Sequence, residues 1–141
     1  LQAEAMKHGL WNGGTPLATS LCKLSSQFSF AGLWQTDLKY GLFNRNIVSV
    51  KMVLPDGDIL ETGSRCMPRA GDFWEYGPGP DLMGLQRSGV GTNGIVVEIT
   101  VKLHPVQAAM SAAVCAFATV KGAADTVIQT LQSGIPIARS S

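Results

Sequence analysis

Three closely spaced glycines lead directly into the clearest strand pattern of the chain. Gly89, Gly91 and Gly94 are followed by residues 95–104, in which apolar and polar residues alternate until Pro105. Such alternation predicts a strand with one apolar face, because successive side chains of a strand point to opposite sides of it. A glycine loop that enters a strand disfavours the folds in which such a loop opens a helix. The predicted apolar face comprises Ile95, Val97, Ile99, Val101 and Leu103, and the polar face comprises Glu98, Thr100, Lys102 and His104.

The glycine spacing also matches the dinucleotide-binding fingerprint, since Gly89 to Gly94 reads G-x-G-x-x-G. That fingerprint needs a helix after it to face the pyrophosphate, and an acidic residue about 20 positions further on to hold a ribose. Here a strand follows and no acidic residue stands at that distance. A nicotinamide-binding module is therefore the weakest hypothesis. The remaining alternatives are a tight turn, or a loop whose free N–H groups donate to a ligand's phosphates or carbonyls.

A hairpin and a short helix are predicted upstream of the glycines. Val48, Val50, Met52 and Leu54 alternate with other residues, Pro55-Asp56-Gly57-Asp58 forms a turn, and residues 59–62 return as a second strand. Asp81 is predicted to cap a short helix that ends at Gln86, because its carboxylate can accept free backbone N–H groups.

The rest of the chain divides into less regular segments. Residues 1–10 are interpreted as the last turns of a helix that Gly9 ends, and residues 11–46 as long loops with short elements. We predict a strand at residues 112–120 and a helix at residues 122–133 that Gly134 ends. Residues 135–141 are interpreted as a strand that is cut short. We therefore expect an excerpt of a longer protein, with a domain boundary at about residues 106–111.

Composition narrows the class of protein. The 141 residues are 45% hydrophobic and 15% charged, a balance typical of a packed globular chain. The net charge of +1 comes from scattered Lys and Arg, which disfavours a nucleic-acid partner. No apolar run reaches the roughly 20 residues of a membrane-spanning helix, and no export signal opens the chain. Three distant cysteines without metal-ligand spacing predict free thiols in a reducing compartment, for which we expect the cytoplasm.

Several motifs in the same order resemble one known family. The stretch from Gly79 to Val96 resembles a signature of the FAD-linked oxidases, also called the vanillyl-alcohol-oxidase or PCMH-type FAD family, which reads G-x-D-L, a spacer, then G-S-E-G-T-L-G-I-V. The family's following strand ends in L-x-P, as at residues 103–105, and its hairpin matches Tyr40-Gly41, residues 50–57 and residues 62–64. Residues 117–138 resemble the start of its substrate-side domain.

The resemblance implies a fold and a cofactor site. The fold would be α+β: residues 1–106 would form the second subdomain of a PCMH-type FAD-binding domain, an antiparallel-rich sheet with flanking helices. Residues 107–141 would begin an α+β substrate (cap) domain with a strand and a helix, and would be truncated. FAD would lie between this subdomain and a first one, not present here, that carries the pyrophosphate loop. The implied cofactor contacts are Thr15, Pro16, Thr19, Ser20, Gly91, Thr92, Asn93, Gly94, Ile95 and Val96.

The resemblance also implies an activity for the whole protein, that of an FAD-dependent oxidoreductase. A small-molecule alcohol or 2-hydroxy acid would transfer a hydride to FAD, which would pass electrons to an acceptor that the sequence does not identify. No metal is implied, homo- or hetero-oligomers both stay open, and the catalytic residues are unknown because the family's lie mostly beyond residue 141. The excerpt by itself is expected to be inactive.

Departures from the family pattern support one alternative. Residues 20–23 read Ser-Leu-Cys-Lys where the family has glycines, Val90 replaces a glutamate, and Arg45 replaces an aspartate. The alternative hypothesis is therefore a non-catalytic flavin-fold scaffold or partner subunit of an oxidase complex. His8 and His104 match no FAD-attachment motif and are interpreted as surface or strand-end residues. We interpret Trp11, Trp34 and Trp74 as packing residues.

Overall fold

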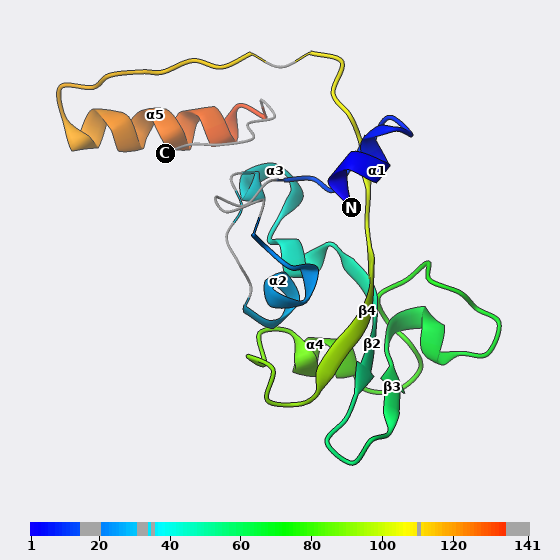
Figure 1. The fold of residues 1–141 in the computed structure, drawn as a ribbon. Coiled ribbons are helices and arrows are strands. Elements are labelled where there is room, and N and C mark those ends of the chain that lie inside the picture. Colours follow the sequence, from blue (N-terminus) through cyan, green and yellow to red (C-terminus); the bar gives the residue numbers. More distant parts are fainter. Residues whose placement is uncertain (15–20, 31–33, 35, 110, 135–141) are drawn as a thin grey trace.

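An antiparallel three-stranded sheet lies at the centre of the structure, a computed structural model that describes residues 1–14, 21–30, 34, 36–109 and 111–134. The strand order is β3-β2-β4, with β2 at Ile47–Val53, β3 at Ile59–Glu61 and β4 at Ile95–Val101 (Figure 1). Both the predicted hairpin and the predicted strand after the glycines are confirmed. The α+β class with antiparallel pairing is confirmed as well.

Short elements surround this sheet. A second sheet pairs β1 with β5, at the two ends of the segment that carries the first sheet. Residues 11–46, expected to be mostly loop, contain helices too short to show a clear period. These elements are α1 (Gln2–Met6), β1 (Leu10–Trp11), α2 (Leu24–Phe30), α3 (Asp37–Tyr40), η1 (Phe43–Arg45), η2 (Gly63–Cys66), α4 (Leu82–Gln86), β5 (His104–Pro105) and α5 (Val120–Gln132).

The hydrophobic core covers one face of the three-stranded sheet. The indole ring of Trp34 stacks on the ring of Phe43 with centroids 4.3 Å apart, and Phe28 from α2 and Met83 from α4 are fully buried beside them. These side chains pack against inward-facing residues of the sheet, so α2, η1 and α4 are held on the same side. The buried cluster comprises Phe28, Trp34, Phe43, Ile47, Val50, Met52 and Met83.

The face of β4 that meets this core changes part-way along the strand. Ile99 and Val101 pack against the core as the alternation predicts, but the next inward residue is Val96, while Ile95 and Val97 are 71% and 56% exposed. The pairing explains the change, because Glu98 is opposite Lys51 and Val96 is opposite Met52, which leaves Val97 as an extra residue. Such a bulge shifts the alternation by one. The prediction that all five alternating residues share one face is therefore wrong.

The opposite, outer face of the sheet carries two cross-strand rows. Ile59, Val53 and Ile95 are direct partners across the three strands and form an apolar row. The next row on the same face is charged: Glu61, Lys51 and Glu98, with Arg65 bonded to both glutamates. Cross-strand partners share a face, so this side presents apolar surface next to an ion-pair network.

The C-terminal segment differs most from the sequence prediction. Residues 112–119 form no strand and are exposed, because a strand needs a partner and none pairs with this stretch in the described part of the chain. The helix predicted at residues 122–133 is confirmed as α5, and Gly134 has the left-handed φ of +73° expected after it. α5 has no buried residue and lies apart from the sheet at the end of an extended segment (Figure 1). The predicted strand at residues 135–141 lies outside the described residues.

The N-terminal helix ends as predicted. α1 is followed by a short turn, and Gly9 has a φ of +69°, the conformation for which glycine is preferred. Beyond it β1 pairs with β5, with Trp11 opposite His104 and Leu10 opposite Pro105. This pairing joins the two ends of the stretch from Leu10 to Pro105, which contains the first sheet.

Candidate functional site: a glycine loop between α4 and β4

Residues 88–94 form a loop with an unusual backbone between α4 and β4. The helix begins as predicted, with the carboxylate of Asp81 accepting a hydrogen bond of 2.7 Å from the N–H of Gly84. After the helix, Ser88, Val90 and Gly91 have φ values of +59°, +53° and +74°. A β-branched residue such as Val90 rarely adopts this conformation, so the surrounding contacts must hold the loop in place.

Helix α2 supplies part of that support. The N–H of Ser88 donates to the carbonyl of Phe28 at 3.1 Å, and the N–H of Val90 donates to the carbonyl of Ser29 at 3.0 Å. The last carbonyls of a helix have no partner inside it. The loop therefore satisfies the free end of α2, and α2 fixes the loop.

The tip of the loop presents free donors. Thr92 is turned back, since its N–H and its hydroxyl both donate to the carbonyl of Gly89, at 2.9 and 2.6 Å. The N–H groups of Gly91, Asn93 and Gly94 donate to no group within the described residues. A Cβ at Gly91 would meet nothing within 4 Å, so a ligand has room beside this backbone. Three free N–H groups on an exposed turn fit an acceptor-rich group such as a phosphate or a ring carbonyl.

Gly94 fixes how the loop enters β4. Its φ is +152°, and a Cβ there would lie 2.6 Å from the carbonyl oxygen of Val53 on the neighbouring strand. Only glycine permits this approach. The next two residues, Ile95 and Val96, begin the pairing with β2, so the backbone that follows the loop is held by the sheet.

The structure brings together six of the ten predicted contact residues. Gly91, Thr92, Asn93 and Gly94 form the tip of the loop, and Ile95 and Val96 begin β4, with Ile95 facing outward and Val96 facing the core. The other four, Thr15, Pro16, Thr19 and Ser20, lie outside the described residues. Asn12, just before them, and Asn44 are buried, and their side-chain oxygens have no partner in the described part.

A buried ion pair that the sequence analysis missed lies at the base of the loop. The guanidinium of Arg87 donates to the Glu75 carboxylate at 2.6 Å and to the backbone carbonyl of Asn44 at 2.9 Å. The side chain of Arg87 is only 6% exposed and that of Glu75 15% exposed, while Lys102 lies 3.7 Å from the other Glu75 oxygen. An arginine directly before a glycine loop was the only sequence signal for this contact.

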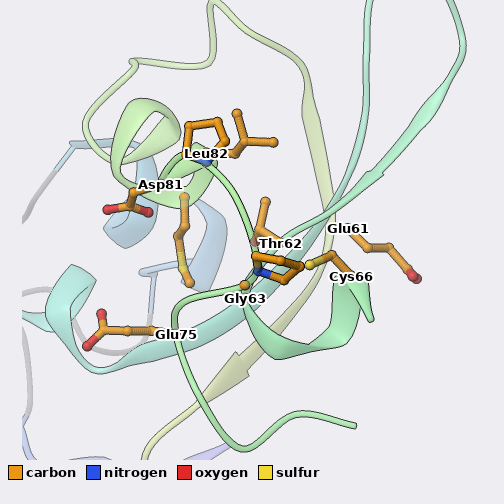
Figure 2. A pocket seen from close by; sticks show the side chains of 11 residues that line it. Glu61, Thr62, Gly63, Cys66, Glu75, Asp81 and Leu82 are labelled. Carbon is orange, nitrogen blue, oxygen red and sulfur yellow. The ribbon is translucent and has the colours of Figure 1, made fainter. Parts of the chain in front are cut away.

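A small pocket beside α4 is lined by acidic residues, but their carboxylates do not point toward a common centre. Its internal volume is about 40 Å³, and it is lined mainly by residues of the segments 61–66 and 75–83. Figure 2 shows the carboxylates of Glu61, Glu75 and Asp81 directed to different sides. Each has a partner already: Lys51 and Arg65 for Glu61, Arg87 for Glu75, and the helix terminus for Asp81. The pocket is best explained as packing between the 62–80 segment and α4.

His104 lies in an aromatic cluster at the β1–β5 junction. Its ring lies 4.4 Å from that of Tyr40, which in turn packs edge-on against Trp11, and its Nε2 is 3.1 Å from the side-chain oxygen of Asn46. Burial, and then the nearby charges of Lys102 and Lys39, lower the pKa of His104. The expected surface or strand-end position is thus a half-buried contact between the two sheets.

The described residues contain no group of His, Cys, Asp and Glu side chains that could hold a metal ion. Cys22, Cys66 and Cys115 are free thiols, as predicted. Of the three tryptophans, Trp34 lies in the core and Trp11 packs edge-on against Tyr40, while Trp74 is 54% exposed with its ring centroid 5.9 Å from that of Tyr76. Among the described residues, none of the helices has the length and apolar character of a membrane-spanning segment.

The chain is similar to parts of several longer known proteins. It is 40% identical over 102 residues to a mitochondrial D-lactate dehydrogenase (cytochrome) of Arabidopsis thaliana, and 37% identical over 133 residues to a probable mitochondrial D-lactate dehydrogenase of Danio rerio. These alignments cover 72% and 93% of this chain but only 17% and 25% of the relatives. An uncharacterised FAD-linked oxidoreductase of Mycobacterium tuberculosis is 37% identical over 68 residues, covering 48% of this chain and 13% of that protein.

Solved structures agree on the fold. Alkyldihydroxyacetonephosphate synthase matches 77% of this chain and 18% of its own length, with a TM-score of 0.62 and 24% identity. The 6-hydroxy-D-nicotine oxidase of Arthrobacter nicotinovorans matches 74% of this chain and 20% of its own length, with a TM-score of 0.58 and 25% identity. No protein-family model matches the chain.

Proposed function

We propose that this chain, which is related to the FAD-linked oxidases with a PCMH-type FAD-binding domain, is part of an FAD-dependent oxidoreductase. Within it, residues 1–106 would form the second subdomain of the FAD-binding domain. The observation that carries this proposal is the loop of residues 88–94. It holds three free N–H donors on an exposed turn and leads into a strand.

In this proposal the chain's residues bind and orient the cofactor. The N–H groups of Gly91, Asn93 and Gly94 would donate to acceptor atoms of FAD, and the backbone of Ile95 and Val96 would provide a rigid wall because it is paired with β2. Thr15, Pro16, Thr19 and Ser20 remain proposed as the second set of contacts, and Thr92 would shape the turn through its bonds to Gly89. When bound, FAD supplies the hydride-accepting chemistry, which no side chain can provide.

The proposed substrate is a 2-hydroxy acid, with other alcohols as the broader class. The plant and fish relatives are named as D-lactate dehydrogenases, and lactate is a 2-hydroxy acid. The group that would remove the hydroxyl proton is not assigned, since the proposal places it outside residues 1–141. A small-molecule substrate fits a chain with a net charge of only +1, and nucleic acid is not proposed as a partner.

Residues 107–141 are proposed to begin the substrate domain. α5 buries none of its residues, and its apolar Val127, Ile128 and Leu131 stay partly exposed, as expected of a helix whose packing partners belong to another part of the protein. We propose homo- or hetero-oligomers without choosing between them. The free thiols support a reducing compartment such as the cytoplasm, although the plant and fish relatives are named as mitochondrial.

The test uses the full-length protein that contains this segment. We expect it to be purified with visible flavin absorption, and we expect a panel of 2-hydroxy acids and alcohols to bleach that absorption under anaerobic conditions. If the protein retains flavin but no member of the panel reduces that flavin, the proposed cofactor site is supported and the proposed substrate class is refuted. A colourless protein that also fails to take up added FAD would favour the scaffold alternative.

A further inference from the structure

We propose that Arg87 is a positioning residue that sets the glycine loop at the geometry needed to bind the cofactor. This inference rests on the proposed function, because it concerns the loop of residues 88–94 as a cofactor site. Arg87 touches neither the free donors nor the open space beside Gly91. It acts through the backbone that precedes them.

The contacts of Arg87 join three separate segments. Its backbone ends α4, its Nε donates to the carbonyl of Asn44 in η1, and its Nη2 donates to Glu75 in the segment after η2. Lys102, just beyond β4, lies 3.7 Å from the same carboxylate. The carboxylate of Glu75 therefore links Arg87, which precedes the loop, to Lys102, which follows β4.

Asn44 extends this link to the loop. Besides its carbonyl, which receives the Arg87 bond, its side-chain nitrogen lies 3.4 Å from the hydroxyl of Ser88. Ser88 and Val90 are the two residues of the loop that hold a left-handed backbone without being glycine, a conformation that is sterically unfavourable for both. Their N–H groups are bonded to Phe28 and Ser29 on the other side. The strained turn is thus fixed from η1 through Arg87 and Asn44, and from α2 through two backbone bonds.

For the position of the loop, the geometry of the Arg87 guanidinium matters more than its positive charge. A guanidinium can donate to a carbonyl and to a carboxylate at the same time because its N–H groups are held in a rigid plane, whereas an ammonium group is a single charged point. A buried ion pair is in general weak evidence for stability, because its desolvation offsets its attraction. A pair that is 6% and 15% exposed at the base of a ligand loop is better explained by the geometry it imposes.

The experiment compares three variants in the full-length protein. Arg87→Lys keeps the charge near Glu75 but loses the double donation. Arg87→Met with Glu75→Leu removes both charges and replaces them with apolar side chains, which is expected to leave the urea midpoint close to that of the wild type. Arg65→Lys is the matched control, since Arg65 is also held by carboxylates but lies on the outer face of the sheet.

We expect both Arg87 variants to weaken FAD binding about tenfold, while the Arg65 control binds as the wild type does. The visible circular dichroism of the bound flavin is expected to change in the Arg87 variants only. Amide hydrogen exchange of Ser88 and Val90 is expected to rise about tenfold, with the β2–β4 amides unchanged. Exchange is measured on the flavin-free proteins, so it tests the loop separately from FAD affinity.

Three results would overturn the inference. In one, FAD affinity and the exchange of Ser88 and Val90 follow the urea midpoint in every variant and recover fully in the double variant, which would make the ion pair merely structural. In the other, the Arg65 control loses as much FAD affinity as the Arg87 variants. In the third, the amide exchange of Ser88 and Val90 is unchanged in the Arg87 variants. A wild-type protein that binds no FAD would instead refute the proposed function itself.

Discussion

Two glycines of the loop, Gly91 and Gly94, share a positive φ but differ in what surrounds them. A Cβ at Gly91 would point into open space, whereas a Cβ at Gly94 would lie 2.6 Å from the carbonyl oxygen of Val53. The Val53 residue is paired with Ile95, so its carbonyl cannot move away without disturbing the β2–β4 pairing. Backbone conformation and packing therefore both require glycine at Gly94, and only conformation requires it at Gly91.

Substitution by alanine separates these two requirements. Gly91→Ala is expected to cost about 1–2 kcal/mol of unfolding free energy, the penalty for a left-handed alanine. Gly94→Ala is expected to cost about 3 kcal/mol or more, because overpacking against a backbone atom adds to that penalty. Urea denaturation of the two variants measures both values. Equal losses would show that the contact with Val53 is relieved by a small movement of the loop.

His104 makes the junction between the two sheets sensitive to pH. Its pKa is lowered by burial and by the charges of Lys102 and Lys39, so the folded protein binds this proton more weakly than the unfolded chain does. The stabilisation from neutral His104 is complete above about pH 6.5 and is lost as the pH falls from there through the lower folded-state pKa. Protonation would place a charge between Tyr40 and the two lysines.

We therefore expect the urea midpoint to decrease on acidification below pH 6.5, and the decrease to be smaller in His104→Gln. Glutamine can still donate to the side-chain oxygen of Asn46 but does not titrate. His8→Gln, at the exposed end of α1, is the control that should keep the wild-type slope. Identical slopes in the wild type and His104→Gln would assign the acid sensitivity to other groups.

At the scale of elements, β4 shows how a single extra residue divides one strand into two faces. The alternation from Ile95 to Leu103 correctly located the strand, but the bulge at Val97 moves Val96 into the core and leaves Ile95 outside. A bulge depends on how two strands pair, and pairing is not recorded in the pattern of one strand. The alternation could therefore predict the existence of β4 and not which residues it buries at its start.

Neighbouring positions on this strand test the bulge. Val96→Thr is expected to cost about 1 kcal/mol, because a hydroxyl replaces a methyl group packed against the core. Val97→Thr is expected to change the unfolding free energy by less than about 0.5 kcal/mol, because the side chain is half exposed and threonine also favours strands. Chemical denaturation of the two variants measures both losses of unfolding free energy. The reverse order of losses would restore the simple alternation and remove the bulge.

The same contrast between local and distant information explains the other outcomes. Asp81, the turn at residues 55–58 and Gly134 act on their immediate neighbours, and the elements they delimit were predicted correctly. The buried contacts of Arg87 join residues 43 and 12 positions apart, and the bonds from the loop to α2 join residues about 60 apart. A short motif gives no information about contacts between residues so far apart in the sequence. The residues that support the candidate site could therefore not be found from the sequence. The loop residues that carry the free N–H groups were named from the resemblance, which spans the loop, and their role in binding a cofactor stays a prediction.

At the scale of the whole molecule, two apolar surfaces have no partner in the described part of the chain. One is the outer row of the sheet, where Ile59 and Ile95 are 61% and 71% exposed, and the other is the apolar side of α5. The chain matches only 17% and 25% of the length of the D-lactate dehydrogenases to which it is similar. Both surfaces are those expected of a segment that packs against further parts of a longer protein.

The 141-residue chain on its own should therefore bind FAD far more weakly than the full-length protein does. The loop offers three backbone donors, but a cofactor bound by one side only remains in contact with water and loses much of the buried area that gives affinity. We expect at least a 100-fold higher dissociation constant, measured by quenching of flavin fluorescence on titration with each protein. The isolated chain is also expected to bind a hydrophobic dye through its exposed apolar surfaces, which the full-length protein should not do. Tight, stoichiometric FAD binding by the isolated chain would mean that the loop and its supports form a complete cofactor site, and would remove the need for the first subdomain.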